Sequence, residues 1–463
     1  MTQSIPKSKC LLAFFSILVF LACEQDKSSN SPKPKMDEVP TNPSKTRQLR
    51  AEALVEHLAA GRFDKARVHF DAAMQKALPE ASLAMAWAQH AGPLGKFIER
   101  ETPRKKRQGT WEIVFVPCRF EKGMLSTKVV FNPKQEIGGL FFLKGDRRYK
   151  PAPYAQVNRF TCKEVQVGQA PWILPGTLCL PKATGPHPGL VLVHGSGPND
   201  RDESMGPNKP FRDLAEGLAS RGVAVLRYDK RTKIHARKLN AATLTTKEES
   251  RDDALAAAAL MAKQNQVDPK KIFILGHSLG GMLLPQILTE APKGHVAGGI
   301  VLAGTTRPFG ELLLQQHRYL FSSDGTIDDK EQTHLDMLQT QIKRYQHPKL
   351  SEAKPDGPLP YNMSVAYALD LRGMDPVGTA AKLSQPLLIL QGKRDYQVTM
   401  KDFSGWKQGL SKQKRITFKT YASLNHLFMP GNGKSLPAEY MIPGHVDPQV
   451  IEDIVVWMEA IKP

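Results

Sequence analysis

Residues 272–288 read IFILGHSLGGMLLPQIL, and this stretch decides the fold that the sequence predicts. The apolar run at its start is typical of a strand buried on both faces, and the residues from Leu279 onward follow a helical pattern. Between them, Gly276 to Gly280 match G-x-S-x-G, a strained strand-to-helix turn that needs glycines because a Cβ would clash. We therefore expect Ser278 to be a nucleophile, with the Leu279 N–H at the helix N-terminus as an oxyanion donor.

The surrounding sequence repeats the strand-then-helix pattern. Short runs rich in Val, Ile and Leu alternate with helical patterns, which predicts a mainly parallel sheet with helices on both faces. An antiparallel hairpin is expected ahead of it, giving about eight strands in all. The hairpin is expected at 159–167 and 174–181, and the parallel strands at 189–195, 223–229, 272–278, 298–304, 386–392 and 416–421.

Two polar segments that follow later strands supply the partners that a serine nucleophile needs. Asp395 comes directly after the strand at 386–392, and His426 lies in a loop after the strand at 416–421. With this strand-turn-helix motif, the acid and the base are expected to follow the serine in the chain order Ser, Asp, His. We expect His426 to act as the base, and Asp395 to hold its tautomer and stabilise its imidazolium form.

Other ionisable side chains near these motifs are expected to be structural. Asp375 precedes Pro376 and reads as a helix cap, so it is the weaker alternative for the acid. His445, the weaker alternative for the base, is expected to pack or to cap near the last helix. His194 and His277 are also expected to hold loops rather than to react.

A small-residue loop follows the first parallel strand and reads His-Gly-Ser-Gly. Such a loop lets backbone N–H groups face a reacting carbonyl, so we expect the Ser196 N–H to be the second oxyanion donor, with Gly197 as the alternative. The polar residues 199–203, together with Arg227 and Asp229, are expected to form a local salt-bridge network. The alternative is that they orient a substrate.

The motifs together resemble those of a known family. They are HGSGPNDRDE (194–203), LRYDKR (226–231), GHSLGG (276–281), QGKRDYQV (391–398) and LNHLF (424–428). Residues 159–463 resemble the α/β-hydrolase family, in the branch of bacterial esterases and of serine-aminopeptidase-like and dienelactone-hydrolase-like sequences. The resemblance implies serine hydrolysis through an acyl-enzyme and does not fix the substrate. Our first hypothesis is the hydrolysis of small carboxylic esters, which needs no metal or organic cofactor.

Two other functions stay open at this point. The same residues could cleave amides, as in an aminopeptidase or acylaminopeptidase, or the fold could serve as a non-catalytic envelope binding protein. In this family an insertion such as 309–372 usually forms a lid over the nucleophile. The alternative is a helical elaboration without gating. The side chains that could line an acyl pocket there are Leu312, Leu313, Leu314 and Tyr319.

The N-terminus has the anatomy of a signal peptide, 1–22, followed by Cys23. The apolar run is shorter than a membrane-spanning helix, and its end resembles a bacterial lipobox, which implies lipidation of Cys23 and a lipid anchor in the bacterial envelope, on the periplasmic or outer-membrane side. Plain secretion and an uncleaved anchor are the alternatives. A polar tether is expected over 23–46 because its composition cannot form a core.

Residues 47–150 are expected to form a separate α+β unit, with helices first and strands from Trp111 onward. The segment resembles a small cone-shaped domain of the nuclear-transport-factor type that often precedes hydrolases, and no function is assigned to it. His57, His69 and His90 are isolated in the sequence, so we expect them to be surface or core histidines rather than ligands. The basic run 104–107 is expected to be a solvated loop, with attraction to an anionic membrane or envelope polymer as the alternative.

Charge and cysteine content narrow the functional classes. The net charge of +19 is spread along the chain of 463 residues, which argues against a nucleic-acid-binding protein. None of the five cysteines has a C-x-x-C neighbour, so a zinc ribbon or thioredoxin-like site is not indicated. Cys162 and Cys179 lie on opposite arms of the predicted hairpin and could form a disulfide in an oxidising compartment.

Overall fold

The computed structural model describes residues 43–145, 149–350 and 355–461, and the chain divides into two compact units at Tyr149 and Lys150. The predicted signal peptide, Cys23 and most of the predicted tether lie outside the described residues. The first described helix, α1 (Pro43–Ala59), starts inside the predicted tether, and a proline is favoured in the first turn of a helix. No helix in the described part of the chain is long and apolar enough to cross a membrane.

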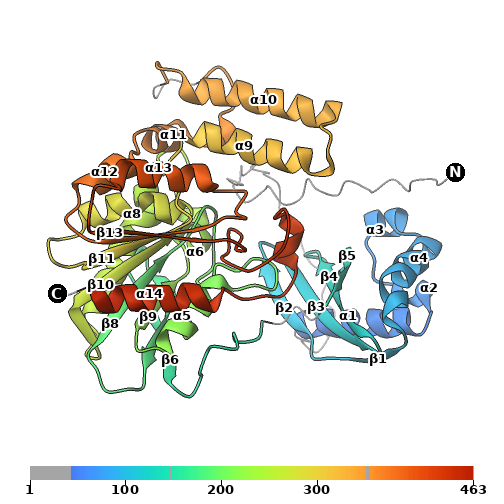
Figure 1. The fold of residues 1–463 in the computed structure, drawn as a ribbon. Coiled ribbons are helices and arrows are strands. Elements are labelled where there is room, and N and C mark those ends of the chain that lie inside the picture. Colours follow the sequence, from blue (N-terminus) through green and yellow to red (C-terminus); the bar gives the residue numbers. More distant parts are fainter. Residues whose placement is uncertain (1–42, 146–148, 351–354, 462–463) are drawn as a thin grey trace, which may run out of the picture. The chain divides into compact units, whose positions relative to one another are not determined.

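The N-terminal unit packs four helices against an antiparallel sheet (Figure 1). Its core is formed by apolar side chains of α1 and of the central strands, including Leu54, Leu58, Val116 and Val129. The sheet order is β1-β3-β4-β5, and β2 pairs with the same side of β3 as β1. The elements are α1, α2 (Phe63–Ala66), α3 (Ala72–Ala77), α4 (Glu80–Ala91), η2 (Gly92–Leu94), β1 (Phe97–Arg100), β2 (Arg104–Gln108), β3 (Trp111–Phe120), β4 (Gly123–Phe131) and β5 (Ile137–Lys144).

The basic run is not a loop, so that prediction is wrong. It forms most of β2, which pairs antiparallel with β3 from Arg104 opposite Phe115 to Gln108 opposite Trp111. Its side chains are mainly exposed although its backbone is paired. Lysine and arginine on an edge strand discourage pairing with a second chain, which accounts for a charged strand at this place.

The second unit has an eight-stranded sheet in the order β13-β12-β11-β10-β8-β9-β7-β6. The strands from β8 to β13 are parallel to one another, and β6 and β7 form the predicted antiparallel hairpin. The strands are β6 (Phe160–Val167), β7 (Leu174–Pro181), β8 (His187–Val193), β9 (Ala224–Tyr228), β10 (Val267–His277), β11 (Gly298–Leu302), β12 (Leu387–Gly392) and β13 (Ile416–Tyr421). This is the doubly covered parallel sheet that the sequence predicts.

Helices cover both faces of this sheet, as the apolar runs require (Figure 1). Alternate residues of β8 enter different cores, Leu190 and Leu192 on one face and Val191 and Val193 on the other. The first face is covered by α5 (Pro210–Ala219) and α14 (Pro448–Ala460). The second is covered by α7 (Asp252–Ala262), α8 (Leu279–Glu290), α12 (Pro376–Lys382) and α13 (Met400–Leu410). A short helix, α6 (Arg231–Ile234), follows β9.

The insertion after β11 contains α9 (Phe309–Phe321), α10 (Asp329–Gln346) and α11 (Val365–Arg372). Leu313 packs with Leu338 and Ile342 between α9 and α10, and Leu314 joins the same cluster. The contact with α10 buries Leu313 and leaves Leu314 half-buried, and the expected acyl-pocket role of these residues stays a prediction. Tyr319 stacks on Tyr396, with ring centroids 5.1 Å apart.

Cys162 and Cys179 oppose each other in the register of β6 and β7 and form a disulfide. Replacing both with alanine is expected to lower the free energy of unfolding by about 3 kcal/mol, because the bond closes a loop of 17 residues that is otherwise free in the unfolded chain. Urea unfolding of the two proteins, each with and without reductant, measures this. The wild type should fall to the stability of the variant on reduction. An unchanged wild type, with the bond shown to be broken by alkylation, would contradict the prediction.

Candidate active site

Ser278 occupies the tight turn between β10 and α8. Its backbone has φ 53° and ψ −113°, a conformation that non-glycine residues rarely adopt. A Cβ at Gly276 would lie 2.1 Å from the carbonyl oxygen of Gly280, and one at Gly280 would lie 2.5 Å from that of Val193. The turn can form only with glycine at both positions, and it leaves the half-buried Ser278 at the carboxyl end of the sheet.

Asp395 and His426 are joined as predicted. Nδ1 of His426 lies 2.7 Å from Oδ2 of Asp395, and both residues are buried. The other carboxylate oxygen of Asp395 accepts the backbone N–H groups of Gln397 and Val398, at 2.8 and 3.0 Å. A carboxylate only accepts, so the proton of a neutral His426 sits on Nδ1 and leaves Nε2 free to accept another.

His426 is held beside the Ser278 turn by His277. The two imidazole rings have centroids 4.6 Å apart, and Nε2 of His277 donates to the carbonyl oxygen of His426 at 3.0 Å. Within the described residues no hydrogen bond joins Ser278 Oγ to His426. Such bonds are often long without substrate and tighten when it binds. The structure therefore brings the three predicted residues to one site and orients the imidazole.

The predicted oxyanion loop runs beside the nucleophile. A Cβ at Gly195 would lie 3.1 Å from Cβ of Ser278. The N–H of Gly195 is already taken by Oε1 of Glu203, at 2.6 Å, so this group is not an oxyanion donor. Leu279 is the first residue of α8, and its N–H therefore has no acceptor within the helix. Ser196 follows in the same loop with an exposed side chain, and Gly197 has φ 91°.

His277 and Glu203 form a buried ion pair behind the nucleophile. Nδ1 of His277 lies 2.8 Å from Oε2 of Glu203, and its Nε2 faces a carbonyl oxygen, so both ring nitrogens face acceptors, which favours the protonated imidazolium form. Burial alone would lower the pKa of His277, but the charge and contact of Glu203 outweigh burial and raise it. Burial likewise opposes the low pKa of Glu203, which the charge of His277 produces. The sequence predicts a structural His277 but gives no partner for it.

The remaining predicted structural residues behave as expected. His194 packs between the rings of Phe211 and Tyr228, and burial lowers its pKa to about 4. Asp375 caps α12 by accepting the N–H of Gly378, at 2.8 Å. Nδ1 of His445 lies 3.1 Å from the carboxylate of Asp213 on α5. Asp375 and His445 thus have other partners than the His426 and Asp395 pair.

The polar loop 199–203 forms the predicted salt-bridge network. Arg201 contacts Asp229 at 3.0 Å, and Asp202 pairs with Arg227 and, at 2.5 Å, with Lys209. These contacts tie the loop that follows β8 to the end of β9. The loop that follows the oxyanion segment is therefore held in place by ion pairs.

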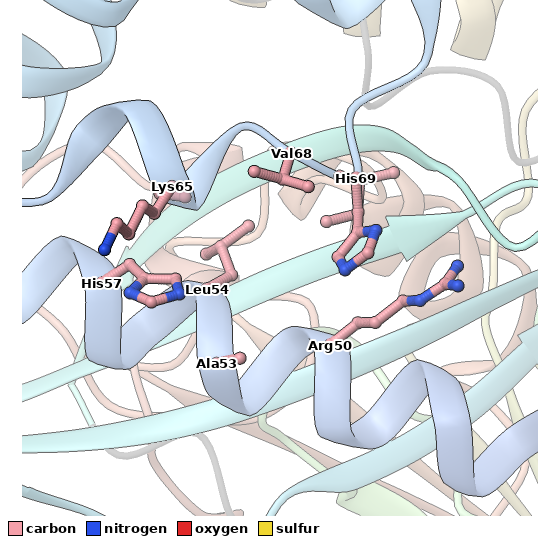
Figure 2. Close-up of a pocket in the computed structure, with 9 residues that line it drawn as sticks. Arg50, Ala53, Leu54, His57, Lys65, Val68 and His69 are labelled. Carbon is pink, nitrogen blue, oxygen red and sulfur yellow. The ribbon is translucent and has the colours of Figure 1, made fainter.

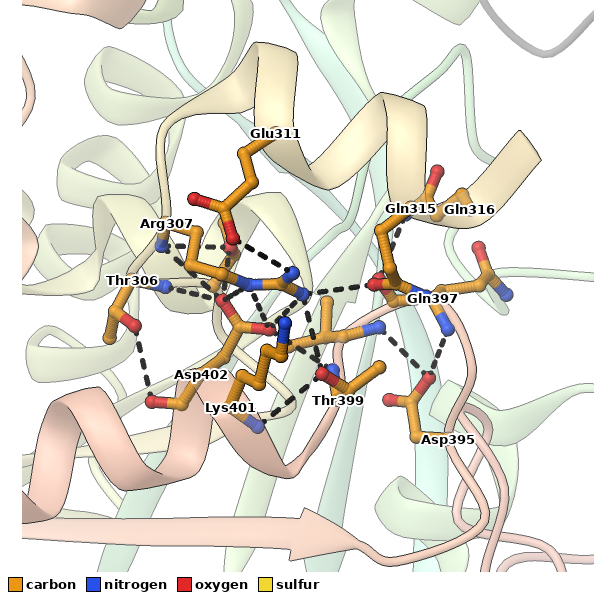
Figure 3. A network of polar contacts seen from close by, with 12 residues as sticks. Thr306, Arg307, Glu311, Gln315, Gln316, Asp395, Gln397, Thr399, Lys401 and Asp402 are labelled. Atoms are coloured by element: carbon orange, nitrogen blue, oxygen red, sulfur yellow. Dashed lines mark hydrogen bonds and ion pairs between the residues drawn. The ribbon is translucent and has the colours of Figure 1, made fainter. Parts of the chain in front are cut away.

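A second buried ion pair, which was not predicted from the sequence, fixes the loop that carries Asp395. Arg307, after β11, donates through Nη2 to the fully buried Asp402 at 2.7 Å (Figure 3). Asp402 also accepts the Thr399 N–H at 3.0 Å, which completes a capping box at the start of α13. The T-x-x-D pattern at 399–402 is a signal that could have indicated this cap.

Helix α9 lies against the same loop. Its Gln315 donates to the carbonyl oxygen of Tyr396 at 3.0 Å, and Gln316 donates to that of Gln397 at 2.9 Å (Figure 3). The first helix of the insertion thus contacts the residues directly after Asp395. Helix α9 therefore borders the loop that carries Asp395, and the lid over the nucleophile stays a prediction.

The N-terminal unit has a cavity of its own, of about 210 Å³. The side chains of Arg50, His57, Lys65 and His69 line it together with apolar residues (Figure 2). The pKa of His69 is lowered by burial and by the charge of Arg50. Two histidines that are isolated in the sequence therefore share one cavity because α1 and the segment after α2 are adjacent. Across the residues that the structure describes, no group of three His, Cys, Asp or Glu side chains is arranged to hold a metal ion.

Comparison with known proteins identifies both units. The family described as serine aminopeptidase, S33, matches residues 190–430, and a family of unknown function, DUF3887, matches residues 51–140. The chain is 37% identical over 405 residues to esterase EstD of Thermotoga maritima. This alignment covers 87% of this chain and 93% of EstD. The chain belongs to the serine aminopeptidase S33 family. It is an esterase-like hydrolase with the α/β-hydrolase fold. The alignment with EstD is longer than the hydrolase unit at 150–463, so this relative shares the N-terminal unit as well.

Solved structures include similar folds at low identity. An esterase from Pyrococcus furiosus is 12% identical, with a TM-score of 0.41, over 69% of this hydrolase and 100% of that chain. A puromycin-hydrolyzing peptidase from Mycobacterium tuberculosis is 15% identical, with a TM-score of 0.43, over 79% of this hydrolase and 48% of that chain.

Glu203→Gln is expected to destabilise the hydrolase most between about pH 4.5 and 6.5. The raised pKa of His277 gives stability that is present below the ordinary imidazole pKa and is lost as pH rises through the folded-state pKa. The lowered pKa of Glu203 gives stability that is lost only as pH falls below its usual range. The loss in the free energy of unfolding is about 3–5 kcal/mol when a buried ion pair is broken. This loss should therefore become smaller at alkaline pH, where a neutral His277 can accept a hydrogen bond from the introduced glutamine amide.

Urea unfolding at several pH values measures this difference. Glu164→Gln is the matched control, because Glu164 pairs with Arg201 but its side chain is 72% exposed. A Glu203→Gln deficit that stays constant from pH 5 to pH 9 would contradict an imidazolium at His277.

Proposed function

We propose that this hydrolase cleaves small carboxylic esters through an acyl-enzyme formed on Ser278. The observation that carries the proposal is the buried hydrogen bond between His426 and Asp395 beside the strained Ser278 turn. Ser278 Oγ attacks the ester carbonyl while Nε2 of His426 takes its proton, and His426 then returns that proton to the leaving alcohol. Water repeats the sequence on the acyl-enzyme. Asp395 keeps the imidazole in the tautomer that can accept, and it offsets the charge that the ring gains.

The negative charge that develops on the carbonyl oxygen needs donors that are already in place. We assign this role to the N–H groups of Leu279 and Ser196, with Gly197 as the alternative to Ser196. The position of Leu279 at the start of α8 supports the first assignment. The Gly195 N–H already donates to Glu203, so we assign the second donor to the next residue, Ser196. Preformed donors are worth about 10²- to 10³-fold in rate each.

Ester cleavage is favoured over amide cleavage by the esterase relative that spans both units. The second candidate, an aminopeptidase or acylaminopeptidase, is favoured by the family description. Rates on a p-nitrophenyl ester and a p-nitroanilide with the same acyl group distinguish them. An anilide rate close to the ester rate would replace the first candidate by the second.

We also propose that the chain is held on a bacterial envelope membrane through lipid on Cys23. The short apolar run before Cys23 supports this, and so does the disulfide between Cys162 and Cys179, because such bonds persist in oxidising compartments. Mass spectrometry of the N-terminal peptide from membranes should show an acylated Cys23, and Cys23→Ser should release the protein. Membrane-bound protein with an unmodified Cys23 would instead indicate an uncleaved anchor, and absence of the protein from membranes would indicate plain secretion.

Replacing Ser278 with alanine is expected to lower kcat by about 10³- to 10⁶-fold, because the covalent step is lost while substrate binding remains. Hydrolysis of a p-nitrophenyl ester series measures the loss. A fluorophosphonate probe, with its adduct located by peptide mass spectrometry, should label Ser278 in the wild type and nothing in the variant. Retained turnover, or an adduct on another residue, would contradict the proposal.

A further inference from the structure

Lys230 is a buried cation at the site that the mechanism above does not use. It follows the end of β9, and only 1% of the residue is exposed. Its Nζ donates to Oε1 of Glu249 at 2.6 Å, which supplies the counter-charge that a buried ammonium needs. The same Nζ donates to the carbonyl oxygen of Gly195 at 2.8 Å. The ammonium thus reaches the backbone of the oxyanion loop.

The carbonyl of Gly195 and the N–H of Ser196 belong to one peptide group. In a trans peptide these two bonds point in opposite directions. Since the carbonyl is directed at Lys230 in the protein interior, the Ser196 N–H points away from Lys230. The preceding peptide is fixed as well, because the Gly195 N–H donates to Glu203, and Asn199 adds a side-chain hydrogen bond to the Gly195 carbonyl at 3.2 Å. The direction of the Ser196 N–H is therefore set by buried groups.

We propose that Lys230 is a positioning residue that aims and polarises the Gly195–Ser196 peptide so that the Ser196 N–H stabilises the oxyanion. The inference rests on the proposed function of Ser278. A hydrogen bond from a charged donor is stronger than one from a neutral donor, and each hydrogen bond in a chain strengthens its neighbours by about 10–30%. Lys230 thus makes the Ser196 N–H a better donor and prevents its peptide from turning.

Glu249 connects this device to the insertion. It lies in a π-helical turn, Lys247–Arg251, and its second oxygen accepts the hydroxyl of Tyr367 on α11 at 2.5 Å. Asp370, one turn further along α11, accepts the N–H and hydroxyl of Thr246 at 2.8 and 2.6 Å. Helix α11 is therefore fastened next to the Lys230 network, and the position of the oxyanion loop depends on the insertion through Tyr367, Glu249 and Lys230.

The next residue along the chain provides a matched control. Arg231 is also buried and also pairs with a carboxylate, that of Asp253, with Nε 3.1 Å from Oδ2. Its cation lies over the ring of Trp172, and neither contact involves the oxyanion loop. Loss of Arg231 therefore tests what the removal of a buried ion pair does by itself.

The experiment compares the wild type with Lys230→Met and Arg231→Met in the full chain. Each is assayed on a short-chain p-nitrophenyl ester and on the thionoester of the same acyl group, whose sulfur accepts hydrogen bonds poorly. We expect Lys230→Met to lower kcat on the ester by about 10- to 100-fold with little change in KM, because a misaimed oxyanion donor acts only in the transition state. The rate on the thionoester should fall much less, so the ratio of the ester rate to the thionoester rate decreases. Arg231→Met should leave that ratio unchanged.

Tyr367→Phe removes one hydroxyl, and it serves if Lys230→Met does not fold. It should lower the rate ratio in the same direction by a smaller factor, with unchanged fluorophosphonate labelling of Ser278. If Lys230→Met folds and its rate ratio is unchanged, because both substrates lose rate equally or not at all, the inference is overturned. If Lys230→Met does not fold, an unchanged ratio in Tyr367→Phe overturns it. Failure of Ser278 to react in the wild type would instead overturn the proposed function, so the two failures are distinguishable.

Discussion

The close approach of the Ser278 turn to the end of β8 is the constraint on which the rest of the site depends. A Cβ at Gly280 would lie 2.5 Å from the Val193 carbonyl oxygen, so the nucleophile turn and the start of the oxyanion loop can pack only without side chains between them. That contact places Gly195 next to Ser278. It also requires β8 and β10 to be paired in register, which they are from Gly189 opposite Ile272 to Val193 opposite Gly276. The strained serine is tolerated because the paired strands and α8 hold both sides of the turn.

Buried ion pairs hold the loops that meet at this turn. Glu203 and His277 join the oxyanion loop to the nucleophile turn, and Arg307 and Asp402 fix the segment after the acid. Lys230 and Glu249 hold the other side of the oxyanion loop. A buried ion pair is weak evidence for stability, because desolvation offsets much of the attraction between the charges. Its advantage here is direction, since in each pair at least one charged group also makes a hydrogen bond to a defined backbone group: Glu203 to the Gly195 N–H, Asp402 to the Thr399 N–H, and Lys230 to the Gly195 carbonyl oxygen.

The sequence predicts the sheet, the hairpin and the elements that carry Ser278, Asp395 and His426, because each is encoded locally by an apolar run and the turn that follows it. It is wrong about residues 104–107, where backbone pairing with β3 makes a strand of a segment that composition alone reads as solvated. It does not predict that Leu313 packs on α10, because helical spacing shows that one face of a helix is apolar without showing what covers that face. The sequence does not predict the cavity that His57 and His69 share for a similar reason, since the two residues come together only when the unit folds.

The sequence by itself determined the class of chemistry. Local patterns and chain order are enough to predict a strained serine turn, and an acid and a base that follow later strands. The tertiary structure alone decided the partners: Glu203 for His277, Asp402 for Arg307, and the carbonyl of Gly195 for Lys230. The physical reason is that a charged side chain has no preferred partner along the chain. Its partner is set by which groups are left together when the sheet and its helices exclude water, and that is a property of the packed fold.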